Sequence, residues 1–249
     1  MELNKRIFSV FADEADRSVI GEIHIGIGYT AVRLQDGRCG ICATLCDATQ
    51  AIHINTDKND YEGRSAIQLL RHIQDEEAHM SRVMAIALVN ALNQPFAHAL
   101  PETPADWHRD LGLTQGANIA MVGFFSPVFE RFEETGFTIR TLDLGQHMGD
   151  PEKFYPWAIK EADALVITAT SVVNNSLETV LERFSGRDIP MLLLGPSTIL
   201  HPEIYEGLPI QYIAGSVVIA PADTLKAVRN GRGSLDVHHQ AKKVYLKLR

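Results

Sequence analysis

In the second half of the chain, short apolar runs alternate with helical stretches, and this alternation constrains the fold more than any other feature. The runs with the length and composition of buried strands are 118–122, 138–142, 164–168, 191–194 and 212–219. Strands joined by helices pair in parallel, and their sheet is covered on both faces. The sequence therefore predicts an α/β domain built on a parallel sheet.

The first half has different periodicities. Ile23, Ile25 and Ile27 alternate with smaller or polar residues, as on a strand with one apolar face. Asp36-Gly37 is a strong hairpin signal. The elements expected are a helix over 2–15, strands over 19–28, 29–34 and 39–45, and helices over 65–73 and 79–92. They form a smaller α+β unit.

Prolines mark the boundary between the two halves. Pro95, Pro101 and Pro104 lie in a stretch that is also rich in charged residues, and proline disfavours a continuous helix. We therefore expect a first domain over 1–95, a linker over 96–115 and a second domain over 116–249.

Composition excludes several classes of protein. Hydrophobic residues make up 45% and charged residues 22%, which is too apolar for a disordered chain. The net charge of −8 argues against a nucleic-acid partner. We interpret the only basic cluster, Lys242, Lys243, Lys247 and Arg249, as a solvated tail.

No apolar run approaches the ~20 residues that a membrane-spanning helix needs. The first residues include several acids, unlike an export signal. We therefore expect a cytoplasmic protein with no membrane partner.

The loops after the predicted strands are the first place to look for a ligand, because ligands of open parallel sheets bind at the carboxyl ends of the strands. These loops combine small residues with hydroxyl and amide groups, which suit an anionic or oxygen-rich ligand. The candidate residues are Gly123, Phe124, Asp143, Thr170, Ser171, Asn174, Gly195, Pro196, Ser197, Thr198, Gly215 and Ser216.

A structural interpretation of the same loops stays open. Asn174 and its neighbours have the composition of a helix cap, and Gly195–Thr198 that of a turn. A dinucleotide site would need a glycine-rich turn after the first strand, but Phe124 follows Gly123. Asp143 nevertheless stands where a ribose-binding acid would, so an enzyme using a nucleotide-like cofactor such as S-adenosylmethionine is an alternative.

Cys39, Cys42 and Cys46 resemble a metal-binding run in spacing only. On a strand, Cys39 and Cys42 point to opposite faces, so we expect them to be buried separately. Glu76-x-x-His79 and His24 are further metal-ligand candidates whose simpler interpretation is structural. A non-catalytic metal carrier or regulator that uses Cys39, Cys42 and a histidine is the third alternative.

Several segments resemble one known family. They are 162–178, which contains Thr168-Ala169-Thr170, the turn Leu194–Thr198 followed by Pro202, Ala214-Gly215, the hairpin segment 28–32 and the helix segment 87–92. Together they resemble the "putative heavy-metal chelation" family of formerly unknown function. This resemblance implies an enolase-N-terminal-like α+β domain followed by a Rossmann-like domain, with a site between them to which Thr30 and Asn90 contribute.

The interpretation that follows is a protein that binds a small polar or anionic ligand in an interdomain cleft. A metal ion or a metal chelate is the candidate ligand, and a role in heavy-metal chelation is implied by the resemblance. The sequence leaves open whether a reaction is catalysed, and a homodimer is also left open.

Overall fold

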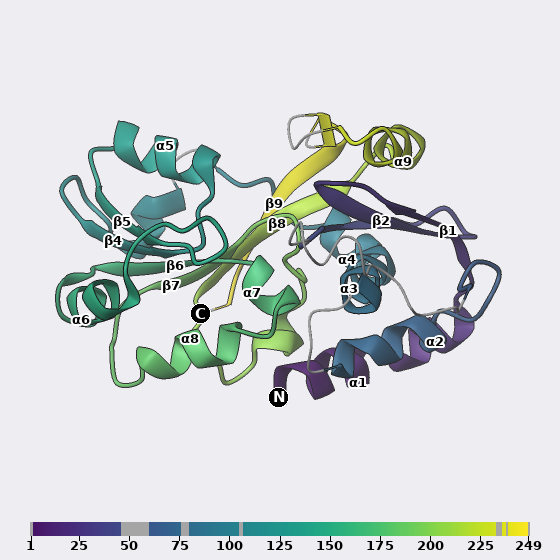
Figure 1. The fold of residues 1–249 in the computed structure, drawn as a ribbon, viewed down its shortest axis with the longest axis horizontal. Coiled ribbons are helices and arrows are strands. Elements are labelled where there is room, and N and C mark those ends of the chain that lie inside the picture. Colours follow the sequence, from purple (N-terminus) through teal and green to yellow (C-terminus); the bar gives the residue numbers. More distant parts are fainter. Residues whose placement is uncertain are drawn as a thin grey trace.

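Two sheets organise the molecule (Figure 1). The computed structural model describes residues 2–45, 60–75, 80–104, 107–232, 236–237 and 239–248. Cys46, Glu76 and His79, which the sequence singled out, lie outside these residues.

The larger sheet has six strands in the order β5-β4-β6-β7-β8-β9. Its strands are β4 (Asn118–Val122), β5 (Thr138–Leu142), β6 (Ala164–Thr168), β7 (Met191–Leu194), β8 (Tyr212–Val218) and β9 (Ala241–Lys247). All neighbouring strands from β5 to β8 pair in parallel, and only β9 is antiparallel to its neighbour. The predicted parallel-sheet domain preceded by a smaller α+β part is confirmed.

Helices cover both faces of this sheet (Figure 1). On one face, α5 (Ser126–Glu134) packs through Phe132. On the other face lie α6 (Pro151–Glu161), α7 (Thr170–Val173) and α8 (Leu177–Arg183). None of the helices described by the structure is both long and apolar enough to cross a bilayer.

The smaller sheet has the order β1-β2-β3. Its strands are β1 (Ile20–Ile25), β2 (Tyr29–Leu34) and β3 (Cys39–Ala43). The antiparallel register runs from Tyr29 opposite Ala43 to Arg33 opposite Cys39, which confirms the hairpin predicted around Asp36-Gly37.

The remaining helices begin and end as follows: α1 at Glu2–Arg17, α2 at Ile67–Leu70, the 3₁₀ helix η2 at Arg71–Gln74, α3 at Met80–Leu92, α4 at Gln94–His98, η3 at Trp107–Leu111, η4 at Pro202–Tyr205 and α9 at Pro221–Arg229. Of these, α3 is the most deeply buried, and almost every residue from Ser81 to Leu92 is inaccessible to solvent. It lies against β3 at Gly40, where a Cβ atom would stand 2.2 Å from the backbone nitrogen of Ala91. Only glycine permits this close approach of helix and strand.

Two sequence predictions about the strands are wrong. The first strand ends at Ile25 rather than at residue 28, and Ile25 and Ile27 are 43% and 85% exposed. A hydrogen bond from Gly26 N to Tyr29 O closes the turn there, so Ile27 lies at its tip and beyond the core.

The second error concerns the basic cluster at 242–247, which is strand β9 and not a solvated tail. Its pairing with β8 runs from Tyr212 opposite Lys247 to Val218 opposite Ala241. Charged side chains on an outer strand protect it from unwanted pairing, which is why the segment looks like a tail in the sequence. Thr103 lies in the segment that connects the two halves of the molecule, which we call the connecting segment. This segment also contacts β9, because Thr103 N donates to Lys243 O.

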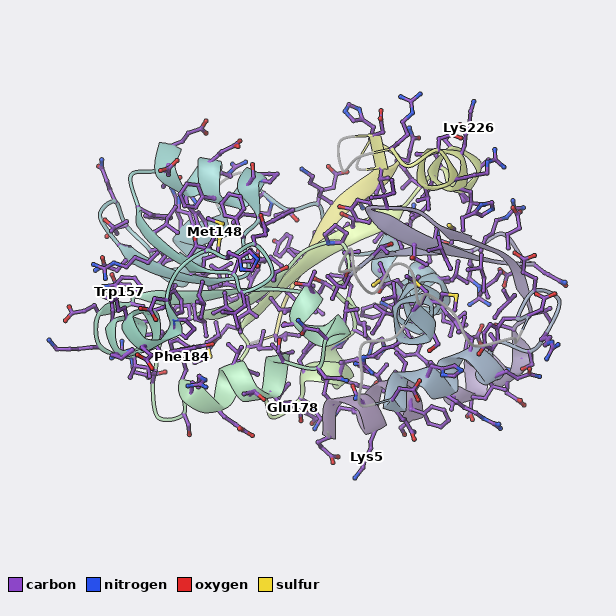
Figure 2. All side chains as sticks on the ribbon, in the orientation of Figure 1. Lys5, Met148, Trp157, Glu178, Phe184 and Lys226 are labelled. Carbon is purple, nitrogen blue, oxygen red and sulfur yellow. The ribbon has the colours of Figure 1, made fainter. Side chains whose placement is uncertain are left out.

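Polar contacts join the two halves. The side chain of Glu178 on α8 accepts hydrogen bonds from the backbone nitrogens of Glu2 and Leu3, at the start of α1. Figure 2 shows Glu178 near this end of α1, with Lys5 projecting outward. The carboxylate compensates the positive end of the helix dipole, so α1 is held against the larger domain at its first turn.

Arg82 is the most deeply buried charged side chain among the described residues, with no exposed surface. Its Nε donates to Val173 O at 2.8 Å, and Nη2 donates to Val172 O at 2.8 Å and to Asn4 Oδ1 at 2.9 Å. Nη1 donates to Ile73 O. Burial lowers the pKa of this guanidinium to about 10, so it remains charged at neutral pH.

We predict that Arg82→Met lowers the free energy of unfolding by about 3 kcal/mol, because buried carbonyl oxygens lose their donors. Urea denaturation measures this change. Arg64→Met is the matched control, since Arg64 is exposed and should change stability by less than about 0.5 kcal/mol. Equal stability of the Arg82 variant and the wild type would contradict the structural role.

Candidate functional site

A pocket of about 460 Å³ opens at the carboxyl edge of the larger sheet. Its walls come from the connecting segment, the start of α5, the loop after β7, the middle of β8, and β9 with the turn before it. The lining residues are Thr103, Pro104, Phe125, Pro127, Val128, Arg131, Leu194, Gly195, Pro196, Ala214, Gly215, Ser216, His239 and Lys243.

The charged side chains among the described residues that line this pocket have one sign. Arg131, His239 and Lys243 line it, and no acidic residue is among the described residues that do so. The whole chain carries a net charge of −8, so the absence of acids among the described lining residues departs from its average composition. The remaining wall is mostly apolar, with Phe125 and Val128 contributing large side chains. Such a pocket suits an anion that also has an apolar body.

Four of the predicted residues line this pocket, namely Gly195, Pro196, Gly215 and Ser216. The sequence analysis placed Gly215 and Ser216 after a strand, but in the structure they lie within β8. β7 pairs with β8 only as far as Ala214, and β8 then continues by pairing with β9. The antiparallel partner therefore carries these two residues past the edge of the parallel sheet.

Gly123 lines a much smaller adjoining cavity, of about 10 Å³, together with Thr168 and Val128. The cavity lies between β4 and β6, where the chain switches from one side of the sheet to the other. Gly123 has φ +84°, and a Cβ there would stand 1.9 Å from Cγ2 of Thr168. The crevice typical of such folds is thus nearly filled by protein atoms at this point.

Thr170 and Ser171 lie in α7 next to this crevice. Thr170 Oγ1 donates to Thr168 Oγ1 at 3.2 Å, so the two hydroxyls form a pair at the end of β6. Ser171 is 3% exposed. Neither lines the 460 Å³ pocket.

Asp143 and Phe124 hold two loops together. Asp143 Oδ2 accepts from Phe124 N at 2.7 Å and from Gln146 Nε2 at 3.1 Å, while Oδ1 accepts from Gln146 N at 2.9 Å. The ring of Phe124 packs on Phe129, with centroids 5.5 Å apart. These contacts orient the loop that precedes α5, so the role assigned to Asp143 in cofactor binding stays a prediction.

Ser197 and Thr198 turn away from the pocket toward the protein interior, and each is 1% exposed. Ser197 Oγ accepts from Ala43 N at 2.9 Å and lies 3.6 Å from Cys42 Sγ. Thr198 Oγ1 donates to Ala214 O at 2.9 Å. The Gly-Pro-Ser-Thr turn therefore joins β3 to β8.

The remaining predicted residues also bond within the protein. Thr30 Oγ1 is 2.9 Å from Thr44 Oγ1, and Asn90 Nδ2 donates to Ile41 O at 2.9 Å. Asn174 is exposed, and its Oδ1 accepts from both N and Oγ of Ser176, which precedes α8. Whether any of these side chains also contacts a ligand stays a prediction.

Arg131, His239 and Lys243 are the basic pocket residues that sequence reasoning missed. Arg131 was one of many charges on a helix, and Lys243 was assigned to a tail. The signal that could have found Lys243 is the alternation of Val244 and Leu246 with charged or polar residues, which is the pattern of a strand.

Cys39 and Cys42 are buried on opposite faces of the smaller sheet, as predicted, because they belong to different hydrophobic clusters. Burial raises the pKa of each thiol to about 12. His24 Nε2 lies 3.2 Å from Glu22 Oε2, in a pair on the surface of β1. Among the described residues, no three acidic, cysteine or histidine side chains gather as a metal site.

Comparisons with known proteins agree with this architecture. Residues 8–93 and 107–247 each match a family model described as "Putative heavy-metal chelation". The chain belongs to this family. The family resemblance inferred from the sequence is therefore confirmed.

The chain is similar to one curated relative in sequence and to two solved structures in fold. An uncharacterised protein of Methanocaldococcus jannaschii is 21% identical over 227 residues, covering 88% of this chain and 86% of the relative. A crystal structure of a family protein of unknown function from Pyrococcus horikoshii has a TM-score of 0.76 at 18% identity, over 98% of this chain and 99% of that one. Another, from Desulfitobacterium hafniense, has a TM-score of 0.71 at 18% identity, over 98% of each chain.

We predict that Cys39 and Cys42 of the folded protein do not react with iodoacetamide at pH 8, because only about one thiol in ten thousand is ionised when the pKa is about 12. The measurement uses Cys46→Ser, which leaves these two thiols alone. Both should react once guanidinium unfolds the chain. Fast alkylation of either thiol in the folded protein would contradict their burial.

We predict that Gly123→Ala lowers the free energy of unfolding by about 3 kcal/mol, because the new methyl group meets Thr168 and the residue needs a positive φ. Gly207→Ala is the matched control. Gly207 also has a positive φ, but a Cβ there meets no atom within 4 Å, so the expected loss is about 1 kcal/mol. Equal losses in thermal or urea denaturation would show that the crevice is not closely packed.

Proposed function

We propose that this protein binds a small organic anion in the 460 Å³ pocket, and that a heavy metal reaches it as an anionic chelate. The observation that carries the proposal is a largely apolar pocket with Arg131, His239 and Lys243 on its rim and no acid among its described lining residues. Membership of a family described by heavy-metal chelation supports the metal component.

The charge of the pocket decides in which form a metal would bind. A free divalent cation would face three basic side chains and gain no carboxylate ligand from the described wall. A metal already wrapped by carboxylates carries a negative charge, which the same side chains attract. The Ser216 hydroxyl adds a polar group for the oxygen atoms of such a ligand.

The pocket adjoins the connecting segment through Thr103 and Pro104. We therefore place the ligand beside the junction of the two halves, on the side of β8 and β9. Thr30 and Asn90, which the family resemblance assigned to the site, would act from behind the Gly-Pro-Ser-Thr turn by supporting β2, β3 and α3.

Binding of 8-anilinonaphthalene-1-sulfonate tests the pocket, because this probe joins an anionic group to an apolar body. Fluorescence titration should give one site per chain. The double variant Arg131→Gln/Lys243→Gln should bind about tenfold more weakly, the result of losing two partly exposed charge interactions of about 0.7 kcal/mol each. Added salt should weaken wild-type binding more than binding by the double variant.

Lys247→Gln is the matched control for Lys243→Gln. Both lysines are exposed on β9, but Lys247 does not line the pocket. It should leave the affinity for the probe unchanged. An unchanged affinity in the double variant, or an equal loss in the control, would contradict binding in this pocket.

Nickel citrate tests the metal component. After gel filtration, the wild type should retain nickel supplied with citrate, and the double variant should not. Two results together would contradict a metal carried as an anionic chelate. The wild type and the double variant would retain nickel supplied as the chloride equally well, and neither would retain nickel supplied with citrate.

A further inference from the structure

Tyr61, His72 and Asp75 form a chain of short hydrogen bonds far from the pocket described above. The phenolic oxygen of Tyr61 lies 2.7 Å from His72 Nε2, and His72 Nδ1 lies 2.7 Å from Asp75 Oδ2. The two rings meet edge to face, with centroids 5.9 Å apart. The three residues thus have the connectivity of a carboxylate, an imidazole and a hydroxyl in series.

The local fold explains how this chain of hydrogen bonds forms. His72 lies in the 3₁₀ helix η2, and Asp75 follows at its end. Side chains three residues apart eclipse one another in a 3₁₀ helix, so this turn brings the carboxylate against the imidazole.

The hydrogen bonds assign the protons. An ionised carboxylate can only accept, so Asp75 fixes the proton of a neutral His72 on Nδ1. Nε2 of this tautomer must then accept, and the hydroxyl of Tyr61 is its donor. His72 is therefore placed to take the phenolic proton, and Asp75 to stabilise the imidazolium that forms.

Tyr61 and His72 of this hydrogen-bond chain lie at the wall of a second cavity, of about 470 Å³. Asp16, Ser65, Gln68 and Arg71 line it together with Tyr61 and His72. No described lining residue is shared with the pocket of the proposed function. Tyr61 is only 5% exposed, so a molecule meets it in this cavity rather than on the open surface.

Hydrogen bonds to backbone oxygens hold His72 and Asp75 in place. Arg82 donates to Ile73 O, next to His72, and Asn175 Nδ2 donates to Asp75 O at 3.1 Å. Arg82 and Asn175 donate to main-chain oxygens, so they orient η2 and leave the side chains of Tyr61, His72 and Asp75 to bond with one another. We call these three side chains the relay. A catalytic group needs this kind of fixed support.

We propose that Tyr61, His72 and Asp75 form a proton-transfer site for a small anion that carries a hydroxyl group. Arg71 binds the anionic group. The hydroxyl gives its proton to Tyr61 Oη as the phenolic proton passes to His72 Nε2, so the products are an alkoxide and an imidazolium paired with Asp75. No oxidant or metal takes part, and the proposal does not depend on the proposed function.

Acetylation by N-acetylimidazole tests the reactivity of Tyr61. In this reaction the phenolic oxygen forms a bond to the acetyl carbon, the bond from that carbon to the imidazole nitrogen breaks, and imidazole leaves with a proton. His72 takes the phenolic proton and so speeds the attack. Peptide mass spectrometry gives the rate at each tyrosine.

In the folded wild type, Tyr61 should be acetylated at least about tenfold faster than Tyr155. Tyr155 is less buried, its ring stacks under Arg183, and no histidine of the described ranges bonds to it. Exposure alone predicts the opposite order. His72→Gln and Asp75→Asn should each lower the rate at Tyr61 by about tenfold and leave the rate at Tyr155 unchanged. Asp60→Asn is the matched control, because within the described part of the chain the Asp60 carboxylate accepts from Glu62 N in the neighbouring turn and does not bond to Tyr61 or His72.

Malate, a small anion with a hydroxyl group, tests the cavity. It should slow acetylation of Tyr61 in the wild type and not in Arg71→Gln, while the exposed control Arg64→Gln keeps the protection. Acetylation of wild-type Tyr61 that is no faster than that of Tyr155, or that malate does not slow, overturns the proposal. These wild-type readouts do not depend on whether a variant folds.

Discussion

The guanidinium group of Arg82 is the interaction on which the joint between the two halves depends. A buried cation must be surrounded by acceptors, and here they are carbonyl oxygens of η2 and α7 and the amide oxygen of Asn4. These acceptors come from three separate parts of the chain. The charge on α3 therefore fixes how α1, η2 and α7 lie relative to one another. An apolar residue at this position could pack, but it could not satisfy these carbonyl groups.

The same requirement explains why many polar residues near the junction bond within the protein. Ser197, Thr198 and Thr30 are almost completely buried, and each has its hydroxyl within hydrogen-bonding distance of another group. A buried hydroxyl without a partner costs free energy whether or not a ligand is present. Small polar residues after a strand can thus serve the joint between domains as well as a ligand, and the sequence does not distinguish these two roles.

The fold was predictable where periodicity reflects burial. Strands β4, β6 and β7 are buried on both faces and read as apolar runs, and the Asp36-Gly37 turn predicted the hairpin in the smaller sheet. The pocket was only half predictable. Its glycines follow from the topology of a parallel sheet, but the basic rim depends on strand register. Arg131 and Lys243 are brought together only because β9 pairs antiparallel with β8, and no local pattern encodes that pairing.

The relay at His72 was missed for a related reason. The sequence drew attention to Glu76 and His79, whose spacing fits an α-helical face. His72 and Asp75 have the same spacing, so spacing alone does not single them out. Their contact with Tyr61 depends on the tertiary fold, because Tyr61 comes from a segment with no periodicity of its own.

The position of β9 at the outside of the sheet also has a consequence for biosynthesis. A ribosome makes β4 to β8 first, and these strands can already pair in parallel with their helices. Two of the three basic groups at the pocket, His239 and Lys243, emerge only with the turn before β9 and with β9 itself. A nascent chain can therefore complete most of its hydrophobic core before it carries two of the basic groups that the proposed anion site requires.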